Sequence, residues 1–434
     1  MKLNSIFLSH KKGTENSETI AMPLPARVKI SMSQHMGAPC EPTVAKGDRV
    51  LVGQVIGESN AFMSCPVHSS VSGTVAAISE LLTAGGKVCK MVEIDTDGEQ
   101  EVSPDVKPPV ITDKASLCEA VRQSGCCGMG GAGFPTHIKL NFDENKYKVD
   151  TLVINAAECE PYITSDYREM MENADDVMCG IKLVRDMLGL KKVVIGIEDN
   201  KPPAIKLMRE KSADDESIEV KVLKSCYPQG AEKVIIFNTT GRAVGEGQLP
   251  SDQGVIVMNV TTAGFIGEYS KTGMPLISKR ITVDGDVVST PCNVKVPIGT
   301  SAEDILKFGD CDKEKVRKAL FGGPMMGMCL YELDTPVTKT TNAILAFGEK
   351  ADKKKGIEDR CAQTNCIKCG RCISACPLNL MPTELEKAYD RRDKEALMKL
   401  KVGLCMNCGS CSYVCPAKRD LAEKNQLAKA FIRT

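Results

Sequence analysis

The chain has 434 residues with 56 basic and 56 acidic side chains, so no net charge draws it to nucleic acid or to an anionic membrane surface. Its length allows several domains of ordinary size, which makes crosslinks unnecessary for a stable core. We find neither the apolar core of a secretory signal near the N-terminus nor a run of about 18 apolar residues that would span a bilayer. These features predict a cytoplasmic protein, which attaches to a membrane only as a peripheral subunit.

Residues 1–110 are expected to form a β-rich domain. Short alternating apolar runs, punctuated by glycine, occur in GDRVLVGQVIGE and PVHSSVSGTVAAIS, and this pattern is typical of a small barrel or sandwich. The two runs resemble the hairpin of swinging-arm domains that carry lipoate or biotin. The segment SNAFMSC between them contains no lysine to be modified, so we expect a lipoyl-like but unmodified docking or structural domain.

Residues 111–268 change to strands and helices in alternation. VDTLVINAA and KKVVIGIED are nearly continuous apolar runs, as in strands buried on both faces. Apolar residues from Met170 to Val184 recur between them at helical spacing. The sequence therefore predicts a Rossmann-like α/β domain with a mostly parallel sheet. Residues 269–348 return to short strands and predict a small α+β module, and the charged segment EKADKKKGIEDR is expected to be a hinge.

Residues 349–434 are dominated by cysteine. The chain contains 21 cysteines, and an odd number in a large chain without a secretory signal favours thiolate ligands in a reducing cytosol over disulfides. This end holds two copies of C-x2-C-x2-C-x3-C-P, the run of a bacterial two-cluster ferredoxin. The segment TELEKAYDRRDKEALMKLK between the copies is expected to be a polar helix. The eight predicted ligands are Cys366, Cys369, Cys372, Cys376, Cys405, Cys408, Cys411 and Cys415.

The spacing also predicts how the ligands are divided. Three closely spaced thiolates bind one cube, and the fourth turns away to the other cube. One [4Fe-4S] cluster is then bound by Cys366, Cys369, Cys372 and Cys415, and the second by Cys405, Cys408, Cys411 and Cys376. Zinc is the alternative, although a structural zinc site needs only four ligands and does not need the third C-x2 step. Cys361 lies outside both runs and is expected to be a spare buried thiol, with an extra ligand as the alternative.

A glycine-rich loop precedes a predicted helix in the α/β domain. Gly128, Gly130, Gly131 and Gly133 stand in CGMGGAGFPTHIK. Glycines in such a loop let backbone amides approach a phosphate closely, and the N-terminus of the following helix favours negative charge. A loop of this kind is a weak signal on its own, because many are only tight turns.

Four segments, in one order, resemble the NADH-oxidising flavin subunit of respiratory complex I. The glycine loop resembles its flavin loop, and NAAECEP, YPQGAEK and MNVTT resemble its acidic, glycine–glutamate and asparagine–threonine segments. Together with the β-rich start and the two-cluster end, the chain resembles over nearly its whole length the C subunit of the Rnf complex, a membrane ferredoxin:NAD oxidoreductase. SQHMGAPCEP, PVHSSVSGTV and GGPMMG are also similar to segments of that family. Residues 269–348 resemble the soluble-ligand-binding β-grasp module that follows the flavin domain in complex I.

The resemblance implies that the α/β domain binds FMN and NADH. Its implied flavin-binding residues are Gly128, Gly130, Gly131, Gly133, Lys139, Asn155, Glu158, Gly230, Asn259 and Thr262. It places Phe134, Glu160 and Glu232 at the nicotinamide nucleotide, as the catalytic residues. Chemistry is consistent with this, because a lysine can pair with the FMN phosphate and a phenylalanine offers an aromatic face to a ring. The sequence departs from the complex I pattern at Met129, Ala157 and Leu140, where arginine, aspartate and tryptophan are usual.

The implied activity is hydride transfer from NADH to FMN, followed by electron transfer to the two clusters and on to a ferredoxin-like partner of a membrane complex, in a reversible reaction. A flavin is needed because nicotinamide moves two electrons at once and each cube moves one. Two alternatives stay open. One is a soluble paralogue that feeds an amino-acid or cobalamin reductase, since the N-terminus lacks the glycine-glycine-histidine-proline-proline opening of Rnf C subunits. The other is a pure iron–sulfur relay that binds no nucleotide.

Overall fold

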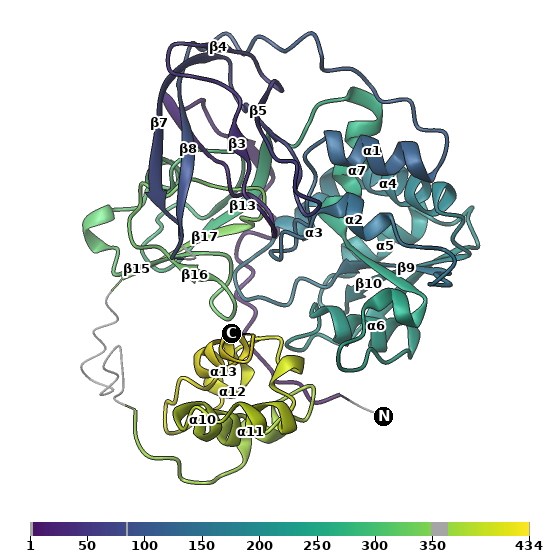
Figure 1. Ribbon diagram of the computed structural model, residues 1–434, viewed down its shortest axis with the longest axis vertical. Helices are drawn as coiled ribbons and strands as arrows, with labels where there is room; N and C mark the ends of the chain where they lie inside the picture. Colours follow the sequence, from purple (N-terminus) through teal and green to yellow (C-terminus); the bar gives the residue numbers. More distant parts are fainter. Residues whose placement is uncertain (1–2, 84–85, 349–362, 434) are drawn as a thin grey trace.

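The structure, a computed structural model, describes residues 3–83, 86–348 and 363–433 (Figure 1). A β-rich part and an α/β domain lie side by side, and a small helical module that carries the cysteines of both runs lies below them. The predicted hinge EKADKKKGIEDR and Cys361 lie outside the described residues. Within the described ranges, no helix has the length and apolar character required to cross a bilayer.

The N-terminal domain consists of two small sheets. The larger sheet is antiparallel and contains, in order, β2 (Arg27–Ser31), β8 (Val88–Thr96), β7 (Gly73–Leu82) and β4 (Arg49–Val50). The smaller sheet contains β3 (Glu41–Pro42), β5 (Val55–Glu58) and β6 (Val67–His68). Alternate residues such as Val28 and Ile30 face inward, where they meet Ile94 and Val92 in register and are fully buried. The period-two pattern therefore gives the predicted barrel- or sandwich-like domain.

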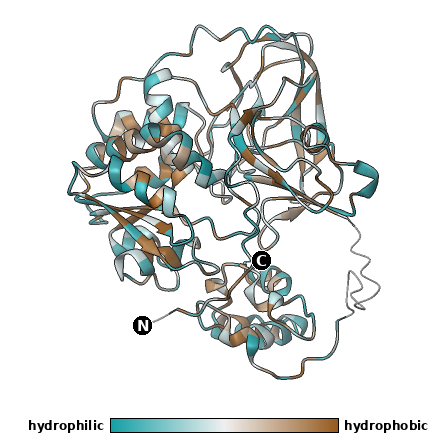
Figure 2. Ribbon diagram, turned by 180° about the vertical axis from the view of Figure 1, so that it is seen from behind, coloured by the Kyte–Doolittle hydropathy of each residue, from teal (hydrophilic) through white to brown (hydrophobic). Residues whose placement is uncertain are grey.

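The α/β domain is built on a parallel sheet, as predicted. Its strands are, in order, β11 (Ile218–Leu223), β10 (Lys192–Glu198), β9 (Thr151–Ala156) and β12 (Val255–Asn259). The helices are α1 (Lys114–Gln123), α2 (Thr136–Leu140), α3 (Ser165–Glu172), α4 (Ala174–Met187), α5 (Pro202–Lys211), α6 (Glu232–Thr240) and α7 (Val260–Thr272), with a 3-10 turn at Pro250–Gln253. Figure 2 shows the apolar strands of this sheet among helices of mixed polarity.

Helices cover both faces of this sheet because its central strand is apolar on both faces. Leu152 and Ile154 of β9 belong to the core with α4 and α7, whereas Val153 belongs to the core with α6. The helical spacing after β9 gives two helices, α3 and α4, which meet at Asn173. α4 lies very close to α7, since a Cβ atom on Gly180 would be 1.9 Å from the Ala263 carbonyl oxygen.

A six-stranded mixed sheet forms the third module. Its order is β1 (Thr19–Ala21), β14 (Cys292–Pro297), β13 (Ser278–Asp284), β17 (Ala343–Phe347), β15 (Lys318–Phe321) and β16 (Met328–Cys329). The helix α8 (Ala302–Phe308) and a short 3-10 turn (Lys313–Lys315) accompany it. β1 pairs in parallel with β14, so part of the first 25 residues lies in this sheet and not in the N-terminal domain.

The cysteine-rich module is a pair of similar halves. It contains α9 (Arg371–Ser374), α10 (Pro382–Asp390), α11 (Lys394–Lys399), a 3-10 turn (Val402–Leu404), α12 (Ser410–Tyr413) and α13 (Leu421–Phe431). The prediction of a single polar helix between the cysteine runs is wrong, because two helices, α10 and α11, occupy that segment. Arg392 has a left-handed backbone with φ of +56° and Asp393 caps α11 by accepting from the Ala396 N–H, and these two features end one helix and start the next.

Candidate functional site

The glycine-rich loop folds back on itself at the start of α2. The Gly128 N–H donates to the Phe134 carbonyl oxygen at 2.8 Å, and the Gly133 N–H donates to the Gly128 carbonyl oxygen at 3.2 Å. Gly131 has φ of +104°, and a Cβ atom there would meet no atom of the described residues within 4 Å. The tip of the loop therefore needs glycine for its backbone and faces open space.

This loop lies on the first turn of α7. The Met129 N–H donates to Thr262 Oγ1 at 3.0 Å, and a Cβ atom on Gly130 would lie 3.4 Å from that of Asn259. Asn259 ends β12 and caps α7, where its side-chain oxygen accepts from the Thr262 N–H at 3.2 Å. The structure thus brings together the loop, Asn259 and Thr262, three parts of the implied flavin site that are far apart in the sequence.

Asn155 joins them from the neighbouring strand. It stands opposite Asn259 in the register of β9 and β12. Its Nδ2 donates to the Gly230 carbonyl oxygen at 2.8 Å, and its Oδ1 accepts from the Ala157 N–H at 3.2 Å. A Cβ atom on Gly230 would lie 2.6 Å from the Ala157 carbonyl oxygen, so only glycine allows segment 227–230 to lie this close to the end of β9.

Glu158 is buried and is linked to Asn259 through Asp166. Its Oε1 accepts from the Asp166 N–H at 2.7 Å, and its Oε2 lies 4.0 Å from Lys12 Nζ and has no hydrogen-bond partner in the part of the chain that the structure describes. The Asp166 carboxylate accepts from Asn259 Nδ2 at 2.7 Å and from Thr261 Oγ1 at 2.6 Å. Burial raises the pKa of Glu158 to about 7, against the opposing effect of Lys12.

Glu160 faces the loop of the GGPMMG segment. One carboxylate oxygen accepts from the Met325 N–H at 3.1 Å, and the other lies 3.4 Å from the Tyr227 hydroxyl. Burial raises the pKa of Glu160, and these hydrogen bonds oppose the shift. The side chain is therefore directed toward the cysteine-rich module, and its implied place at the nicotinamide stays a prediction.

Lys139 and Glu232, implied at the phosphate and at the nucleotide, lie next to each other. Lys139 Nζ is 3.3 Å from Glu232 Oε2 and donates to the Val257 carbonyl oxygen at 3.0 Å. Both side chains are partly exposed, at 30% and 45%. An exposed ion pair of this kind contributes less than about 1 kcal/mol, so exchange of the Glu232 carboxylate for a phosphate costs Lys139 little. Phe134 is half-buried and lies two residues before the start of α2, the helix that carries Lys139.

The two cysteine runs have the same backbone path. In each, the residue two after the first cysteine and the glycine after the second cysteine have left-handed backbones, and so does the residue three after the fourth cysteine. These residues are Lys368, Gly370 and Asn379 in the first run, and Asn407, Gly409 and Lys418 in the second. Backbone amides reach the sulfurs, since the Lys368 N–H donates to Cys366 Sγ at 3.4 Å and the Leu380 N–H to Cys376 Sγ at 3.3 Å.

The positions of the thiols agree with the predicted exchange of fourth cysteines. Cys376 lines one cavity together with the three leading cysteines of the second run, Cys405, Cys408 and Cys411. Burial raises the pKa of Cys372, and the nearby thiols of Cys415 and Cys366 add to the shift. We call the first group, with Cys376, the inner set and the group of Cys366, Cys369, Cys372 and Cys415 the outer set. Among the described residues, no three His, Cys, Asp or Glu side chains lie close enough together to hold a single metal ion, and cluster ligation by each set stays a prediction.

The inner set faces the α/β domain through Tyr227. This side chain is 1% exposed, and its hydroxyl donates to the Cys408 carbonyl oxygen at 2.6 Å. Tyr227, Leu8 and Cys408 form one apolar cluster, against which Cys159 and Met325 pack. Tyr227 was predicted only as part of a flavin segment, without a link to the cysteines. Lys12 and Asp166 were not predicted, since no motif marks a buried contact between distant segments.

Three models of known protein families match parts of the chain. Residues 6–99 match the RnfC barrel sandwich hybrid domain, residues 121–268 match the Nuo51 FMN-binding domain, and residues 365–418 match a 4Fe-4S dicluster domain. Together with the site described above, these matches define an electron-transfer flavoprotein with iron–sulfur clusters. FMN and two [4Fe-4S] clusters are its cofactors. The N-terminal barrel, the flavin domain and the dicluster domain predicted from the sequence are thereby confirmed.

Individual relatives identify the family. The chain is 41% identical over 372 residues to the C subunit of the Na(+)-translocating ferredoxin:NAD(+) oxidoreductase complex of Acetobacterium woodii, and the match covers 85% of this chain and 82% of that protein. It is 41% identical to the proton-translocating counterpart of Clostridium ljungdahlii (86% and 81% covered) and 37% identical to the C subunit of the ion-translocating oxidoreductase complex of Rhodobacter capsulatus (90% and 75% covered). The chain belongs to this family of Rnf C subunits, and the soluble paralogue and the nucleotide-free relay are not favoured.

A solved structure has a related fold. The crystal structure of an air-oxidized NAD+-reducing [NiFe]-hydrogenase superposes with a TM-score of 0.51 at 18% identity, covering 74% of this chain and 63% of that chain. At this identity the likeness concerns the fold alone.

Proposed function

We propose that this protein is the electron-input subunit of a ferredoxin:NAD(+) oxidoreductase complex, which oxidises NADH reversibly and passes electrons through FMN to two [4Fe-4S] clusters and on to a ferredoxin-like partner subunit. Family membership supports this function. The observation that carries it is the contact between the two halves of the site, in which Tyr227 of a flavin segment donates to the Cys408 carbonyl oxygen. The protein would lie on the inner face of the cell membrane, held there by the other subunits.

Two finer features of the fold belong to the proposal. The parallel sheet with helices on both faces supports a Rossmann-like description of residues 111–268. The mixed sheet with α8 supports a β-grasp-like description of residues 269–348. The proposed domains are then 1–110, 111–268, 269–348 and 349–434, with β1 of the first joined to the sheet of the third.

The residues present fit an FMN. Among the described residues, Gly131 faces open space and the buried Oε2 of Glu158 has no hydrogen-bond partner, and a ligand would complete both features. The exposed amides of the glycine loop and Lys139 would hold the phosphate, and Asn155 and Asn259 are oriented beside them. Bound FMN supplies the exchange between a two-electron donor and one-electron acceptors. The protein's part is to bind, orient and exclude water, with Phe134 and Glu232 at the nucleotide side.

The cysteines fit a pair of cubes in a defined order. The inner set lies against the α/β domain through Cys408, whereas Cys369 of the outer set is exposed. Because electron transfer needs short distances, this arrangement supports entry of electrons at the inner set and their exit at the outer set. Backbone N–H groups that reach sulfur atoms would tune the potential of each cube.

Anaerobic purification followed by NADH titration tests the function. We expect about eight iron and eight sulfide per chain, as two [4Fe-4S] clusters require, together with bound FMN. NADH should bleach the flavin first and the clusters after it. Dithionite provides the control, since it reduces both groups without the nucleotide site. Flavin that dithionite reduces and NADH does not would refute the dehydrogenase function, and protein without flavin would leave only the relay.

A further inference from the structure

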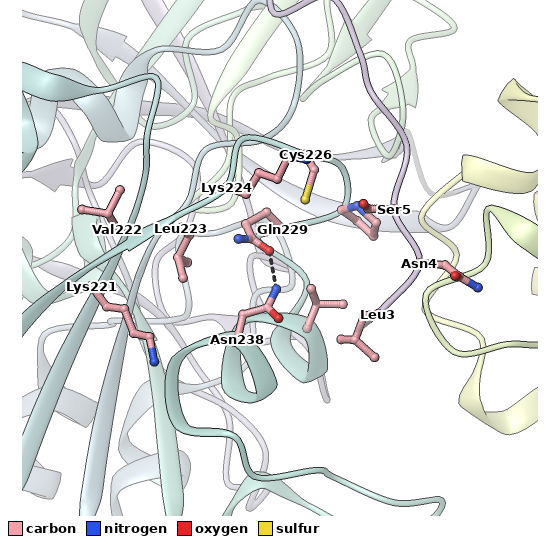
Figure 3. A pocket seen from close by; sticks show the side chains of 12 residues that line it. Leu3, Asn4, Ser5, Lys221, Val222, Leu223, Lys224, Cys226, Gln229 and Asn238 are labelled. Carbon is pink, nitrogen blue, oxygen red and sulfur yellow. Dashed lines mark hydrogen bonds between the residues drawn. The ribbon is translucent and has the colours of Figure 1, made fainter. Parts of the chain in front are cut away.

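Residues 4–14, here called the N-terminal strap, run from the cysteine-rich module along the α/β domain (Figure 1). Figure 3 shows the beginning of this path, where Leu3 and Ser5 line a pocket beside β11 and Asn4 points toward the cysteine-rich module. The strap belongs to none of the motifs predicted from the sequence, yet it contacts both halves of the proposed redox site.

One end of the strap holds the inner cysteine set. Asn4 Nδ2 donates to the Cys376 carbonyl oxygen at 3.1 Å and to Asn379 Oδ1 at 2.9 Å. Ile6 and Tyr227 exchange two backbone hydrogen bonds, each 2.9 Å long. Leu8 is 5% exposed and packs against Tyr227 and the inner set. The strap therefore packs at the interface between the α/β domain and the cysteine-rich module.

The other end of the strap holds the acidic loop after β9. Lys12 Nζ donates to the carbonyl oxygens of Glu158 and Glu160, each at 2.8 Å, and also to that of Ile163. Only 8% of the Lys12 side chain is exposed. Three carbonyl dipoles converge on this one buried ammonium group, so its removal would take a charged donor from all three at once.

The charge environment of Lys12 is mixed. Burial lowers the pKa of Lys12, and the carboxylates of Glu158 and Glu198 oppose this shift while Lys201 adds to it. Lys201 is itself paired with Glu198 at 2.9 Å. The ammonium group of Lys12 is thus influenced both by Glu158 of the acidic loop and by the buried ion pair of Lys201 and Glu198.

We propose that the N-terminal strap is a two-ended positioning element of the redox site: Lys12 fixes the loop that carries Glu158 and Glu160, and Asn4 fixes the inner cysteine set against the α/β domain. This inference rests on the proposed function. It assigns to the two ends separate effects, one on flavin and nucleotide binding and the other on electron transfer from flavin to cluster.

The variant Lys12→Met tests the flavin end, with Lys11→Met as the matched control. Lys11 is the exposed neighbour of Lys12, and its Nζ lies 5.4 Å from the ring centroid of Tyr162. We expect Lys12→Met to raise the dissociation constant of FMN and the KM for NADH by about tenfold or more, because a charge-assisted contact to three carbonyls is lost. With FMN saturating, kcat with a dye acceptor and the iron content should match the control. Equal FMN affinity and KM in the two variants would overturn the role of Lys12.

The variant Asn4→Ala tests the other end and remains available if Lys12→Met fails to fold. Its control is Ser9→Ala, at an exposed position of the same strap. We expect Asn4→Ala to keep the FMN affinity and the KM for NADH, and to slow reduction of the clusters by the reduced flavin several-fold. Cluster reduction as fast as in the control would overturn the role of Asn4. Wild-type protein whose flavin NADH cannot reduce would instead refute the proposed function itself.

Discussion

Tyr227→Phe is the sharpest perturbation of the contact between the two halves of the site. The substitution removes one hydroxyl from a side chain that is 1% exposed and keeps the ring. That hydroxyl donates to the Cys408 carbonyl oxygen at 2.6 Å. Burial and the nearby Glu160 carboxylate raise the pKa of Tyr227 above its ordinary value of about 10, so the hydroxyl is protonated and can donate at neutral pH.

The expected size of the effect follows from the Cys408 carbonyl oxygen, which loses its hydrogen-bond donor. The Cys408 carbonyl would lose this donor in a buried place, which costs about 1–3 kcal/mol. That loss weakens the docking of the inner set by about 5- to 150-fold. In part of the molecules the inner cube then lies farther from the flavin. We therefore expect the rate of electron transfer from flavin to cluster to fall about fivefold or more. Hydride transfer from NADH should not change, because the ring and the backbone of segment 227–230 remain.

Anaerobic stopped-flow absorption separates the two steps. Bleaching of the flavin after mixing with NADH reports the first step, and the later bleaching of the clusters reports the second. Tyr413→Phe is the matched control, since Tyr413 lies in the same module as Cys408 and is 56% exposed. If the cluster phase of Tyr227→Phe is as fast as that of the control, the Tyr227 contact does not hold the cube beside the flavin, and our order of electron transfer loses its support.

Three further predictions concern the flavin loop, the buried acid and the crossed ligands. Burial raises the pKa of Glu158 from 4.5 to about 7 in the folded protein. Between these two pH values the folded state therefore binds one more proton than the unfolded state, and the free energy of unfolding falls as pH rises through this range. Urea unfolding at pH 5 and pH 8 should show wild type losing up to about 3 kcal/mol more than Glu158→Gln, and equal losses would contradict the buried acid. Gly131→Ala should lower the free energy of unfolding by about 1–2 kcal/mol because φ is +104°. FMN titration should also show weaker binding to this variant. The control is Gly98→Ala, where φ is +84° and no described atom lies within 4 Å, and this variant should bind FMN as the wild type does. Cys376→Ser should alter the electron paramagnetic resonance of the inner cube and Cys415→Ser that of the outer cube, whereas the opposite assignment would disprove the crossing of fourth ligands.

The sequence predicted the features that arise from local chemistry. The cysteine runs specify their module because the ligand spacing has to match a cube, and the left-handed residues in both runs follow from the same path. The strands β9 and β10 were predictable because a strand buried on both faces needs a continuous apolar run. The breaks at Asn173 and Arg392 were not, since each depends on the backbone of a single residue within a segment of helical character.

The long-range contacts that assemble the site could not be predicted from the sequence, for a different reason. Lys12 and Glu158 are separated by 146 residues, and Tyr227 and Cys408 by 181. A lysine or a tyrosine gives no periodic signal that it will be buried, and each becomes informative only when its partner is known. Resemblance to the flavin subunit of complex I supplied the candidate flavin residues, which stay a prediction, but it could not supply partners that lie outside the matched segments.

Segment 227–230 explains why the two cofactor sites should respond together to some changes and separately to others. At one end Tyr227 donates to the inner cysteine set, and at the other the Gly230 carbonyl oxygen accepts from Asn155 beside the glycine loop. A change that shifts the whole segment, such as a side chain at Gly230 that would lie 2.6 Å from the Ala157 carbonyl oxygen, must disturb both flavin binding and the docking of the cube. A change confined to the Tyr227 hydroxyl disturbs only the second. The ratio of the two effects across such variants therefore measures how rigidly this four-residue segment couples the flavin to the cluster.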